Sequence, residues 1–206
     1  MKKLFIYYLL GIIVSSIAVA QERKEESNLR QYYSGKFGFY QPGDGLNNGL
    51  LFGIDGVTEF IHYHFILTGA IDLYPKQTIS IFKDPKPDVQ QQSMILLPLH
   101  VNDGYQFFNA PLADSRGFIG AGIGYYFYFY SVEYRSTGGI IPSPTTQTES
   151  KNGGSFFATA FVRFLLGKIF VEPRLYLATK KEDSVSGGYN YVVNPTGFSI
   201  SLGFQY

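Results

Sequence analysis

Three histidines are the residues whose type and spacing come nearest to a chemical site. His62 and His64 are two residues apart, so in an extended strand they share a face, and His100 lies on a later strand. Three imidazoles on neighbouring strands could form a His₃ metal site. The alternative is polar lining of a narrow lumen, which we favour because no diagnostic ligand spacing or second shell accompanies them. We therefore expect neither a metal nor a cofactor.

A pair of opposite charges flanks a predicted hairpin turn. Gly167-Lys168 have the form of a two-residue turn, in which glycine at the first position permits type II′. Counting outward from that turn places Arg163 directly opposite Glu172, with Cβ atoms roughly 5 Å apart. Arg174 shares the face of Glu172 and is expected to join a lumen ion pair. Such pairing compensates charge in a confined space, whereas a proton path is the functional alternative.

The sequence contains little that supports an enzymatic function. A barrel enzyme that modifies lipids needs a nucleophile beside a histidine near the outer leaflet. No His-x-Ser pattern occurs, and the histidines fall toward the opposite end of the predicted strands. The spacing of Gly120, Gly122 and Gly124 also fails as a dinucleotide motif, because they lie inside a strand pattern with no helix after it. We expect these glycines to leave room for Tyr126 and Tyr128 across the lumen.

Strands must position these residues, because apolar and polar residues alternate along most of the chain. The clearest case is 196–206, where large apolar side chains occupy every second position up to Tyr206. Eight such strands are predicted, at 36–40, 49–57, 59–74, 93–102, 117–131, 155–166, 169–179 and 196–206. A tight turn is expected at 56–58 and a short extra strand at 78–82. Pro98 and Pro173 put strand boundaries in doubt or mark bulges.

Short and long connections alternate between these strands. The predicted long loops are 75–92, 133–154 and 180–195, all rich in proline, glycine or polar residues. Long loops at one end and short turns at the other are typical of outer-membrane barrels. The predicted fold is therefore all-β, an eight-stranded antiparallel up-and-down transmembrane β-barrel.

The apolar face of the strands indicates which side meets lipid. A soluble, lipocalin-like barrel would turn this face inward, where its bulk leaves no space for a ligand, and would expose a face poor in Lys and Glu. We therefore expect lipid outside, against Tyr63, Phe65, Leu67, Phe127, Phe129, Phe198, Ile200, Leu202 and Phe204. The 17 tyrosines suit a membrane interface, and the chain has no cysteine.

The first residues predict export. Residues 1–20 combine two lysines, an apolar run and a small-x-small end, which indicates a cleaved secretory signal rather than a membrane helix. Residues 21–34 are expected to be a flexible periplasmic leader, and 35–206 the barrel. Cleavage removes Lys2 and Lys3 and leaves 15 basic against 16 acidic residues, a balance that gives no reason to expect nucleic acid.

Three stretches of the chain have a recognisable pattern: the glycine-rich strand 116–125, the hairpin 157–177 with Glu172 and Arg174, and the aromatic-ended last strand. Together they resemble the small outer-membrane β-barrel domain family (OmpA-like and opacity-type eight-stranded barrels). The resemblance implies outer-membrane insertion, with Phe204 and Tyr206 as the signal for the barrel assembly machinery. It carries over no catalytic residue.

The expected function is a structural or surface-interaction role. The partners would be outer-membrane lipid, the assembly machinery and an unidentified molecule bound by the external loops, with the protein as a monomer. A porin-like conduit for small solutes is the first alternative. A lipid-modifying barrel enzyme, acting through His62 or His64, is the second.

Overall fold

The computed structural model describes residues 28–43, 46, 48–77, 89–136, 145–179, 181–185 and 189–206. The predicted signal peptide, the first half of the predicted leader (21–27) and the short strand at 78–82 lie outside these residues. Among the described residues, no helix has the length and hydropathy needed to cross a membrane.

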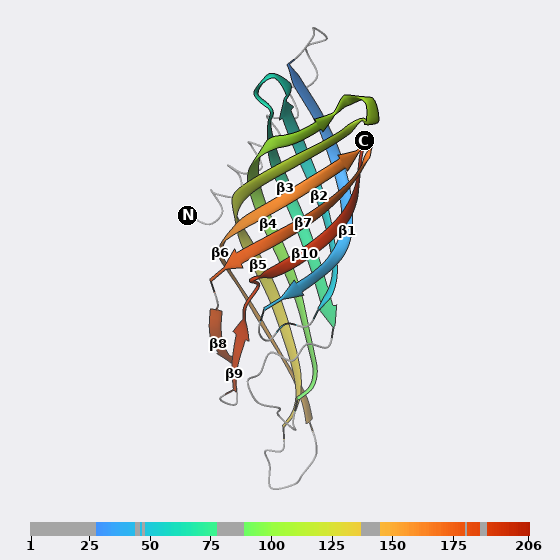
Figure 1. Cartoon of the computed structure of the whole chain (residues 1–206). Helices are drawn as coiled ribbons and strands as arrows, with labels where there is room; N and C mark the ends of the chain where they lie inside the picture. Colours follow the sequence, from blue (N-terminus) through green and yellow to red (C-terminus); the bar gives the residue numbers. More distant parts are fainter. Residues whose placement is uncertain are drawn as a thin grey trace.

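Eight antiparallel strands close into a barrel, as predicted (Figure 1). They are β1 (Leu29–Pro42), β2 (Gly49–Phe60), β3 (Phe65–Gln77), β4 (Val89–Ala110), β5 (Ser115–Ser136), β6 (Thr145–Leu166), β7 (Ile169–Ala178) and β10 (Gly197–Gln205). Each strand pairs with the next one in this series, and β10 closes the ring by pairing with β1, with Phe37 opposite Leu202. A separate two-stranded sheet, β8 (Lys181–Val185) with β9 (Tyr189–Val193), lies in the last connection.

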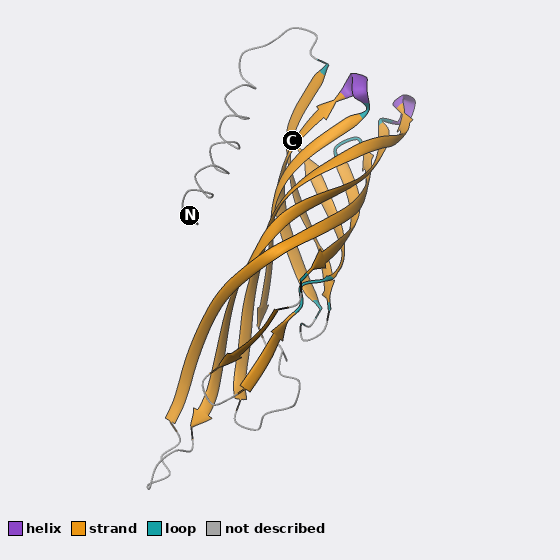
Figure 2. Ribbon diagram, turned by 90° about the vertical axis from the view of Figure 1, so that its left-hand side faces the viewer, coloured by secondary structure: helices purple, strands orange, loops and turns teal. Residues whose placement is uncertain are grey.

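The barrel has two unlike ends. At the turn end, β2–β3, β4–β5 and β6–β7 are joined by the short 3₁₀ segments η1 (Ile61–Tyr63) and η2 (Pro111–Ala113) and by Gly167-Lys168. At the loop end are the longer connections, and β4, β5 and β6 extend there well beyond their neighbours (Figure 2). Gly167 has φ +58° whereas Lys168 does not have a positive φ, which agrees with the predicted type II′ turn.

The strands have the predicted two faces. Along β10, Phe198, Ile200 and Leu202 are exposed on the outside, and Ser199 and Ser201 are buried inside. This alternation follows from the period of two in a pleated strand. It places polar groups in the interior and apolar groups on the outer wall.

The prediction of a turn at 56–58 is wrong. Gly56 lies within β2 and pairs with Gly69, and the chain reverses instead at η1. His64 ends that segment in the left-handed conformation with φ 52°, and the rings of Phe60 and Phe65 approach to 5.8 Å across the turn. The residues 61–64 therefore belong to a turn rather than to a strand.

Three other boundaries also differ from the prediction. β1 begins at Leu29, so 29–34 belong to the barrel and not to the leader; Arg30 lies opposite Glu59 there, and their charged groups are 3.8 Å apart. Most of the predicted loop 133–154 is strand, because 145–150 pair with 131–136. The predicted loop 180–195 contains β8 and β9. A solvated sheet needs backbone pairing but no apolar alternation, so periodicity misses it.

Neither proline ends a strand. The β3–β4 ladder lacks two pairs around Pro98, between Ile71–Leu99 and Tyr74–Leu96, and then continues in the same register. The β6–β7 ladder is interrupted in the same way beside Pro173. Each proline lacks the N–H that the ladder needs on one side. The strands thus run through both positions without a bulge.

Candidate functional site: the charged lumen

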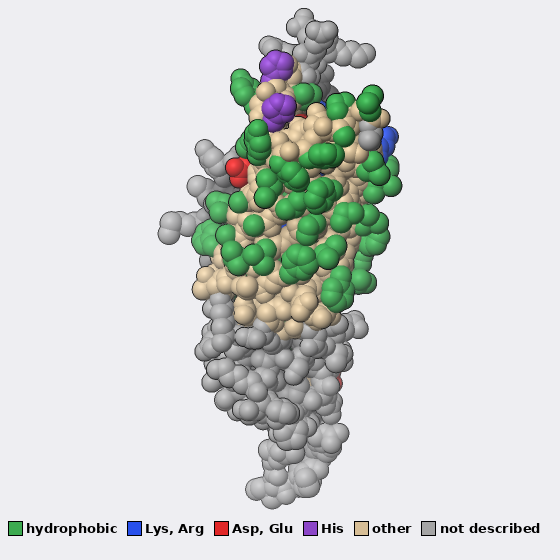
Figure 3. All heavy atoms as spheres, viewed as in Figure 1, with side chains coloured by type: hydrophobic (Ala, Val, Ile, Leu, Met, Phe, Trp, Pro, Cys, Tyr) green, Lys and Arg blue, Asp and Glu red, His purple; other side chains and the backbone are tan. Residues whose placement is uncertain are grey.

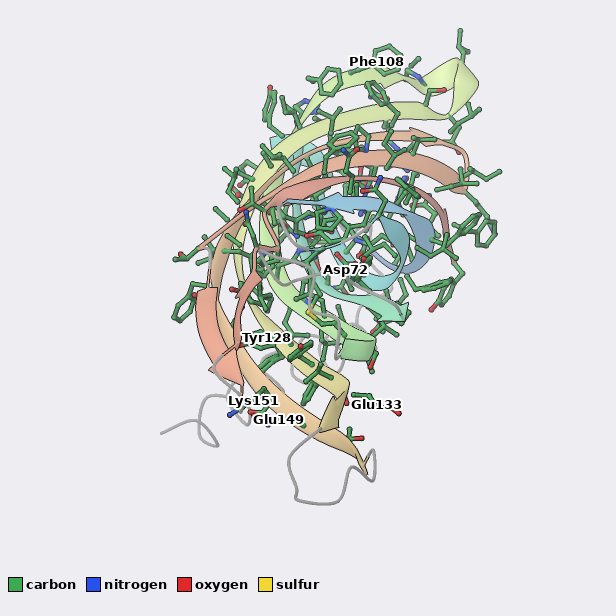
Figure 4. All side chains as sticks on the ribbon, turned by 90° about the horizontal axis from the view of Figure 1, so that it is seen from below. Asp72, Phe108, Tyr128, Glu133, Glu149 and Lys151 are labelled. Carbon is green, nitrogen blue, oxygen red and sulfur yellow. The ribbon has the colours of Figure 1, made fainter. Side chains whose placement is uncertain are left out.

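The interior of the barrel holds a cluster of ionic side chains from five strands. Lys36 lies on β1, Asp55 on β2, Asp72 on β3, Arg163 on β6, and Glu172 and Arg174 on β7, each at most 5% exposed. Three positive and three negative charges make this set neutral. Figure 4 shows Asp72 pointing into the space enclosed by the strands.

Lys36 stands at the centre of the cluster. Its Nζ lies 3.1 Å from Asp55 Oδ1, 3.0 Å from Asp72 Oδ1 and 3.6 Å from Glu172 Oε1. Its ladder neighbours are Gly53 and Gly203. A Cβ at Gly53 would lie 2.2 Å from Asp72 Oδ1 and 2.5 Å from Lys36 Cε, so the ion pair needs a glycine there.

The structure brings Arg163 and Glu172 together. Phe164 lies opposite Val171 and Phe161 opposite Arg174, which is the register counted from the turn. Arg163 Nε donates to Glu172 Oε2 at 2.7 Å, and Arg174 Nη2 donates to Glu172 Oε1 at 2.8 Å. The Arg163 guanidinium also reaches across to Asp55 on β2, with Nη2 to Oδ2 at 2.5 Å.

Sequence reasoning missed the partners Lys36, Asp55 and Asp72. Each lies on the polar face of its strand. This place in the alternation of polar and apolar residues was the only feature of the sequence that indicated an inward-facing side chain. Nothing local indicates that β1, β2 and β3 bring these groups to β6 and β7. Barrel closure decides that contact.

A hydrogen-bond network continues the cluster toward the loop end. His100 Nε2 lies 2.9 Å from Asp72 Oδ2, and the Tyr176 hydroxyl donates to the same oxygen at 2.8 Å. Arg174 Nη1 donates to Asn102 Oδ1 at 2.8 Å. The second nitrogen of His100 lies against Asn102 and Arg174, neither of which is a nucleophile.

The three histidines do not form one site. His62 and His64 lie on or beside the exposed turn η1, whereas His100 is buried in the lumen. The prediction that all three line the lumen is therefore correct for His100 alone. In the part of the chain that the structure describes, no group of three His, Cys, Asp or Glu side chains is placed to hold a metal ion.

Further layers fill the lumen on both sides of this cluster. Toward the turn end, Arg116 Nη1 donates to Glu59 Oε1 at 2.6 Å. Toward the loop end, the Tyr40 ring packs edge-on against Tyr74 at 5.2 Å and against Tyr176 at 5.4 Å. Leu46 and Val193 from the loop-end connections belong to the same buried aromatic cluster. The described side chains therefore fill this part of the lumen.

Gly120 and Gly124 of β5 make room for phenylalanines rather than tyrosines, and Gly122 lies against Asn102. A Cβ at Gly124 would lie 2.6 Å from Phe157 Cζ, and one at Gly120 would lie 2.6 Å from Phe161 Cε1. Both phenylalanines come from the neighbouring strand β6. The expectation that these glycines accommodate Tyr126 and Tyr128 is thus wrong, although both tyrosines are buried in the lumen.

Most of the residues predicted to meet lipid lie on the outer wall. Leu67, Phe129, Phe198, Ile200, Leu202 and Phe204 are exposed, and Phe65 and Phe127 are half-buried on the same face. Tyr63 is also exposed, but it lies on η1 outside the strands. Figure 3 shows apolar side chains gathered on the wall between the two ends. We call this surface the apolar belt.

The barrel is similar in structure to known outer-membrane proteins. No protein-family profile and no curated protein matches the sequence. The structure resembles Ail, the attachment invasion locus protein of Yersinia pestis, with a TM-score of 0.52 at 8% identity over 85% of this chain and 97% of Ail. A second Ail structure, in complex with the heparin analogue sucrose octasulfate, gives 0.51 at 9% identity over the same shares.

A major outer membrane protein from Thermus thermophilus is similar to the same extent. Its TM-score is 0.51 at 11% identity, over 86% of this chain and 100% of that one. At sequence identities this low, the structural similarity establishes the fold alone. The chain therefore has the fold of the small outer-membrane β-barrels, with eight antiparallel strands in a closed ring.

Proposed function

We propose that this protein is an integral outer-membrane barrel with a structural or surface-interaction role. One observation carries the proposal, the inverted distribution of polarity. Charged side chains are buried inside the barrel, and large apolar side chains are exposed on its wall. Water does not favour that arrangement, whereas a bilayer does, because a closed barrel satisfies its backbone in lipid and presents an apolar band.

The filled lumen supports a role other than transport. Lys36, Arg163 and Glu172 occupy the middle of the barrel, and the tyrosine layer lies between them and the loop end. Eight strands give an interior that side chains just fill. A porin-like conduit would need a water path through these layers, so no observation favours it.

The enzymatic alternative also lacks support. His62 and His64 lie in the short β2–β3 connection at the turn end, whereas a surface lipid would approach the loop end. His100 is 4% exposed and paired with Asp72. A buried, paired imidazole has no access to a lipid substrate.

The contact surface would be the extension of β4, β5 and β6 with the loops around it. On the side away from β5, the β6–β7 ladder begins at Phe157 opposite Ala178, so no described strand pairs with 145–156 there. Glu133, Glu149 and Lys151 lie on this extension (Figure 4). An extended, polar sheet edge of this kind suits protein contacts.

A polyanion is not the partner that the charges favour. An Ail structure contains a heparin analogue. The segments 75–92, 133–154 and 180–195, which were predicted to be loops, carry seven basic and six acidic residues. This near balance gives no electrostatic preference for a sulfated ligand.

Cysteine labelling on intact cells tests the proposal, because the chain has no cysteine of its own. Ser150 is exposed on the β6 extension, and Lys168 is exposed in the turn at the opposite end. We expect a membrane-impermeant maleimide to label Ser150→Cys on intact cells and Lys168→Cys only after permeabilisation. Labelling of both positions alike, or a protein that fractionates as soluble, would overturn the proposal. A folded barrel should also migrate differently on gels with and without heating.

A further inference from the structure

Three buried hydrogen-bond donors in the turn-end half of the lumen have no partner among the described residues. They are Arg163 Nη1, Arg116 Nε and the Tyr32 hydroxyl. The side chains of Arg163 and Arg116 are only 1% and 8% exposed, and the three donor atoms themselves are out of contact with bulk water. An unpaired buried donor is costly, most of all on a charged group. Three such donors together therefore indicate a bound species.

Two ion pairs cross the lumen on either side of Tyr32. Arg163 on β6 reaches Asp55 on β2, with Nη2 to Oδ2 at 2.5 Å. Arg116 on β5 reaches Glu59, also on β2, with Nη1 to Oε1 at 2.6 Å. Asp55 and Glu59 are four residues apart on the inward face of β2, and Tyr32 of β1 pairs with the residue midway between them. The Tyr32 ring thus enters the lumen between the two ion pairs.

The three donors meet in one layer of the lumen. Phe118 lies opposite Arg163 in the β5–β6 ladder and two residues from Arg116 on the inward face of β5. Tyr32 packs against the buried apolar cluster of Val57, Ile66, Phe118 and Phe161. The charged groups that act electrostatically on the Tyr32 hydroxyl are Arg163, Glu59, Arg116 and Arg30. The hydroxyl and both guanidinium groups therefore surround the same part of the lumen, which we call the donor layer.

The charges around the donor layer do not balance. The cluster around Lys36 has three positive and three negative groups and is neutral by itself. The donor layer adds two arginines, Arg116 and Arg30, but a single carboxylate, because Glu59 Oε2 lies 2.5 Å from Arg116 Nη1 and 3.8 Å from Arg30 Nη1. These inward-facing charges of the described strands therefore leave one positive charge over.

We propose that the donor layer binds one small monovalent anion, chloride, between the Tyr32 hydroxyl, Arg163 Nη1 and Arg116 Nε. A guanidinium group donates hydrogen bonds and accepts none, so the two arginines exclude a cation. Water accepts the same hydrogen bonds, yet it leaves the surplus positive charge uncompensated in a desolvated place. One monovalent anion satisfies the donors and neutralises that charge together. The site lies inside the barrel and is separate from the proposed contact surface.

Anion binding should stabilise the fold, because the site joins β1, β5 and β6 and exists only in the closed barrel. Urea unfolding of the detergent-folded protein measures this. At constant ionic strength, chloride or bromide is titrated in place of gluconate, a much bulkier monovalent anion. Tyr32→Phe removes one donor and keeps the ring, whereas Tyr33→Phe makes the same change on the exposed neighbouring side chain.

We expect both halides to stabilise the wild type and Tyr33→Phe with the same dissociation constant. Tyr32→Phe should bind about tenfold more weakly, because it loses a hydrogen bond to a charged group. Equal halide dependence of the two variants would show a general salt effect and overturn the site. Stability of the wild type that does not change with halide would also overturn it, since water would then be the occupant.

Bromide soaked into crystals of the wild type provides a measurement that no variant can disturb. Anomalous scattering should show bromide in contact with Arg163 Nη1, Arg116 Nε and the Tyr32 hydroxyl. Bromide at the protein surface alone, or a water at the donor layer, would contradict the inference. Both measurements are made in detergent, so they do not depend on the proposed location in the outer membrane.

Discussion

At the scale of single residues, each lumen charge depends on partners from distant strands. Arg163 contacts Glu172 on β7 and Asp55 on β2, and its guanidinium lies 4.3 Å from the centre of the Phe170 ring. Desolvating an ion is expensive, so its cost is offset only while opposite charges remain beside it. The stability of the lumen charge cluster therefore depends more on the balance of positive and negative charges than on any single contact.

Charge balance predicts a coupling between Arg163 and Glu172. Arg163→Ala should cost about 3–5 kcal/mol, because it leaves Asp55 and Glu172 short of a counter-charge. The double variant with Glu172→Ala should lose less than the sum of the two single losses, and less than Arg163→Ala alone. Urea unfolding of the refolded barrel in vesicles measures all three free energies.

Arg30→Ala is the control for this cycle. The Arg30 side chain is 50% exposed and lies 3.8 Å from Glu59, so its loss should cost about 0–1 kcal/mol. Additive losses for Arg163 and Glu172 would contradict a shared network.

A charge on the apolar belt should be costly in proportion to its depth. Ile71 faces outward between Ile54 and Leu99, farther from the turn end than Leu67. Ile71→Arg should cost about 2–4 kcal/mol, as arginine does near the midplane of a membrane barrel. Ser150→Arg, on the exposed extension of β6, should be nearly neutral in the same urea titration.

Equal tolerance of Ile71→Arg and Ser150→Arg would refute the lipid-facing assignment. Thr68 is no control for the belt, because it is buried in the lumen and accepts a hydrogen bond from Asn102 Nδ2 at 2.9 Å. An arginine there would upset the lumen instead.

At the scale of elements, β7 and β10 form a hairpin whose ladder breaks and resumes as β8 and β9. Gly197 lies opposite Tyr176, and Lys181 lies opposite Val193. Between these two pairs the chain advances five positions from Tyr176 to Lys181 and four positions from Val193 to Gly197. The first side therefore has one extra residue at the break. The small sheet is therefore a continuation of the barrel hairpin, offset by one residue.

Thr196 secures this break. Its hydroxyl donates to the Ala178 carbonyl at 2.9 Å and accepts from the Ala178 amide at 3.0 Å. Thr196→Val removes both bonds at nearly constant shape and should cost about 1–3 kcal/mol. Hydrogen exchange should show faster exchange of the Ala178 amide.

Thr148→Val, at an exposed position on β6, provides the matched comparison. It should leave exchange at Ala178 unchanged. If Thr196→Val leaves that exchange unchanged as well, Thr196 does not secure the break.

At the scale of the whole molecule, the last residues of the chain complete the ring. The Tyr206 amide donates to the Tyr33 carbonyl at 3.0 Å, the Tyr33 amide donates back at 3.3 Å, and the two rings are 6.4 Å apart. Phe204 pairs with both Gly35 and Ile169. These residues thus have a structural role beside the predicted assembly signal.

Two variants separate the structural role from the signal. Deletion of Phe204–Tyr206 should leave the protein in the periplasm, because it removes both. Tyr206→Ala keeps the backbone pairing, so it should fold normally in detergent yet accumulate less in the outer membrane. Normal outer-membrane levels of the deletion, measured by fractionation, would contradict both roles. If Tyr206→Ala lowers folding in detergent as much as it lowers the amount in the outer membrane, closure of the barrel is the only role of Tyr206.

Local patterns were enough to predict the faces of the strands and one contact. A pleated strand repeats every two residues, so alternation along 196–206 separates inside from outside without any knowledge of neighbours. The Arg163–Glu172 contact was equally accessible, because a two-residue turn fixes the register of its hairpin. Both are local properties of the chain.

The rest of the lumen depends on how the strands close in space. Lys36 meets Glu172 because β1 closes against β10, and that closure brings together groups far apart in sequence. His62 and His64 shared the period of a strand, yet a left-handed residue at the turn removes both from it. The polar strands beyond the barrel carry no apolar pattern, because water solvates both their faces and pairing alone forms them.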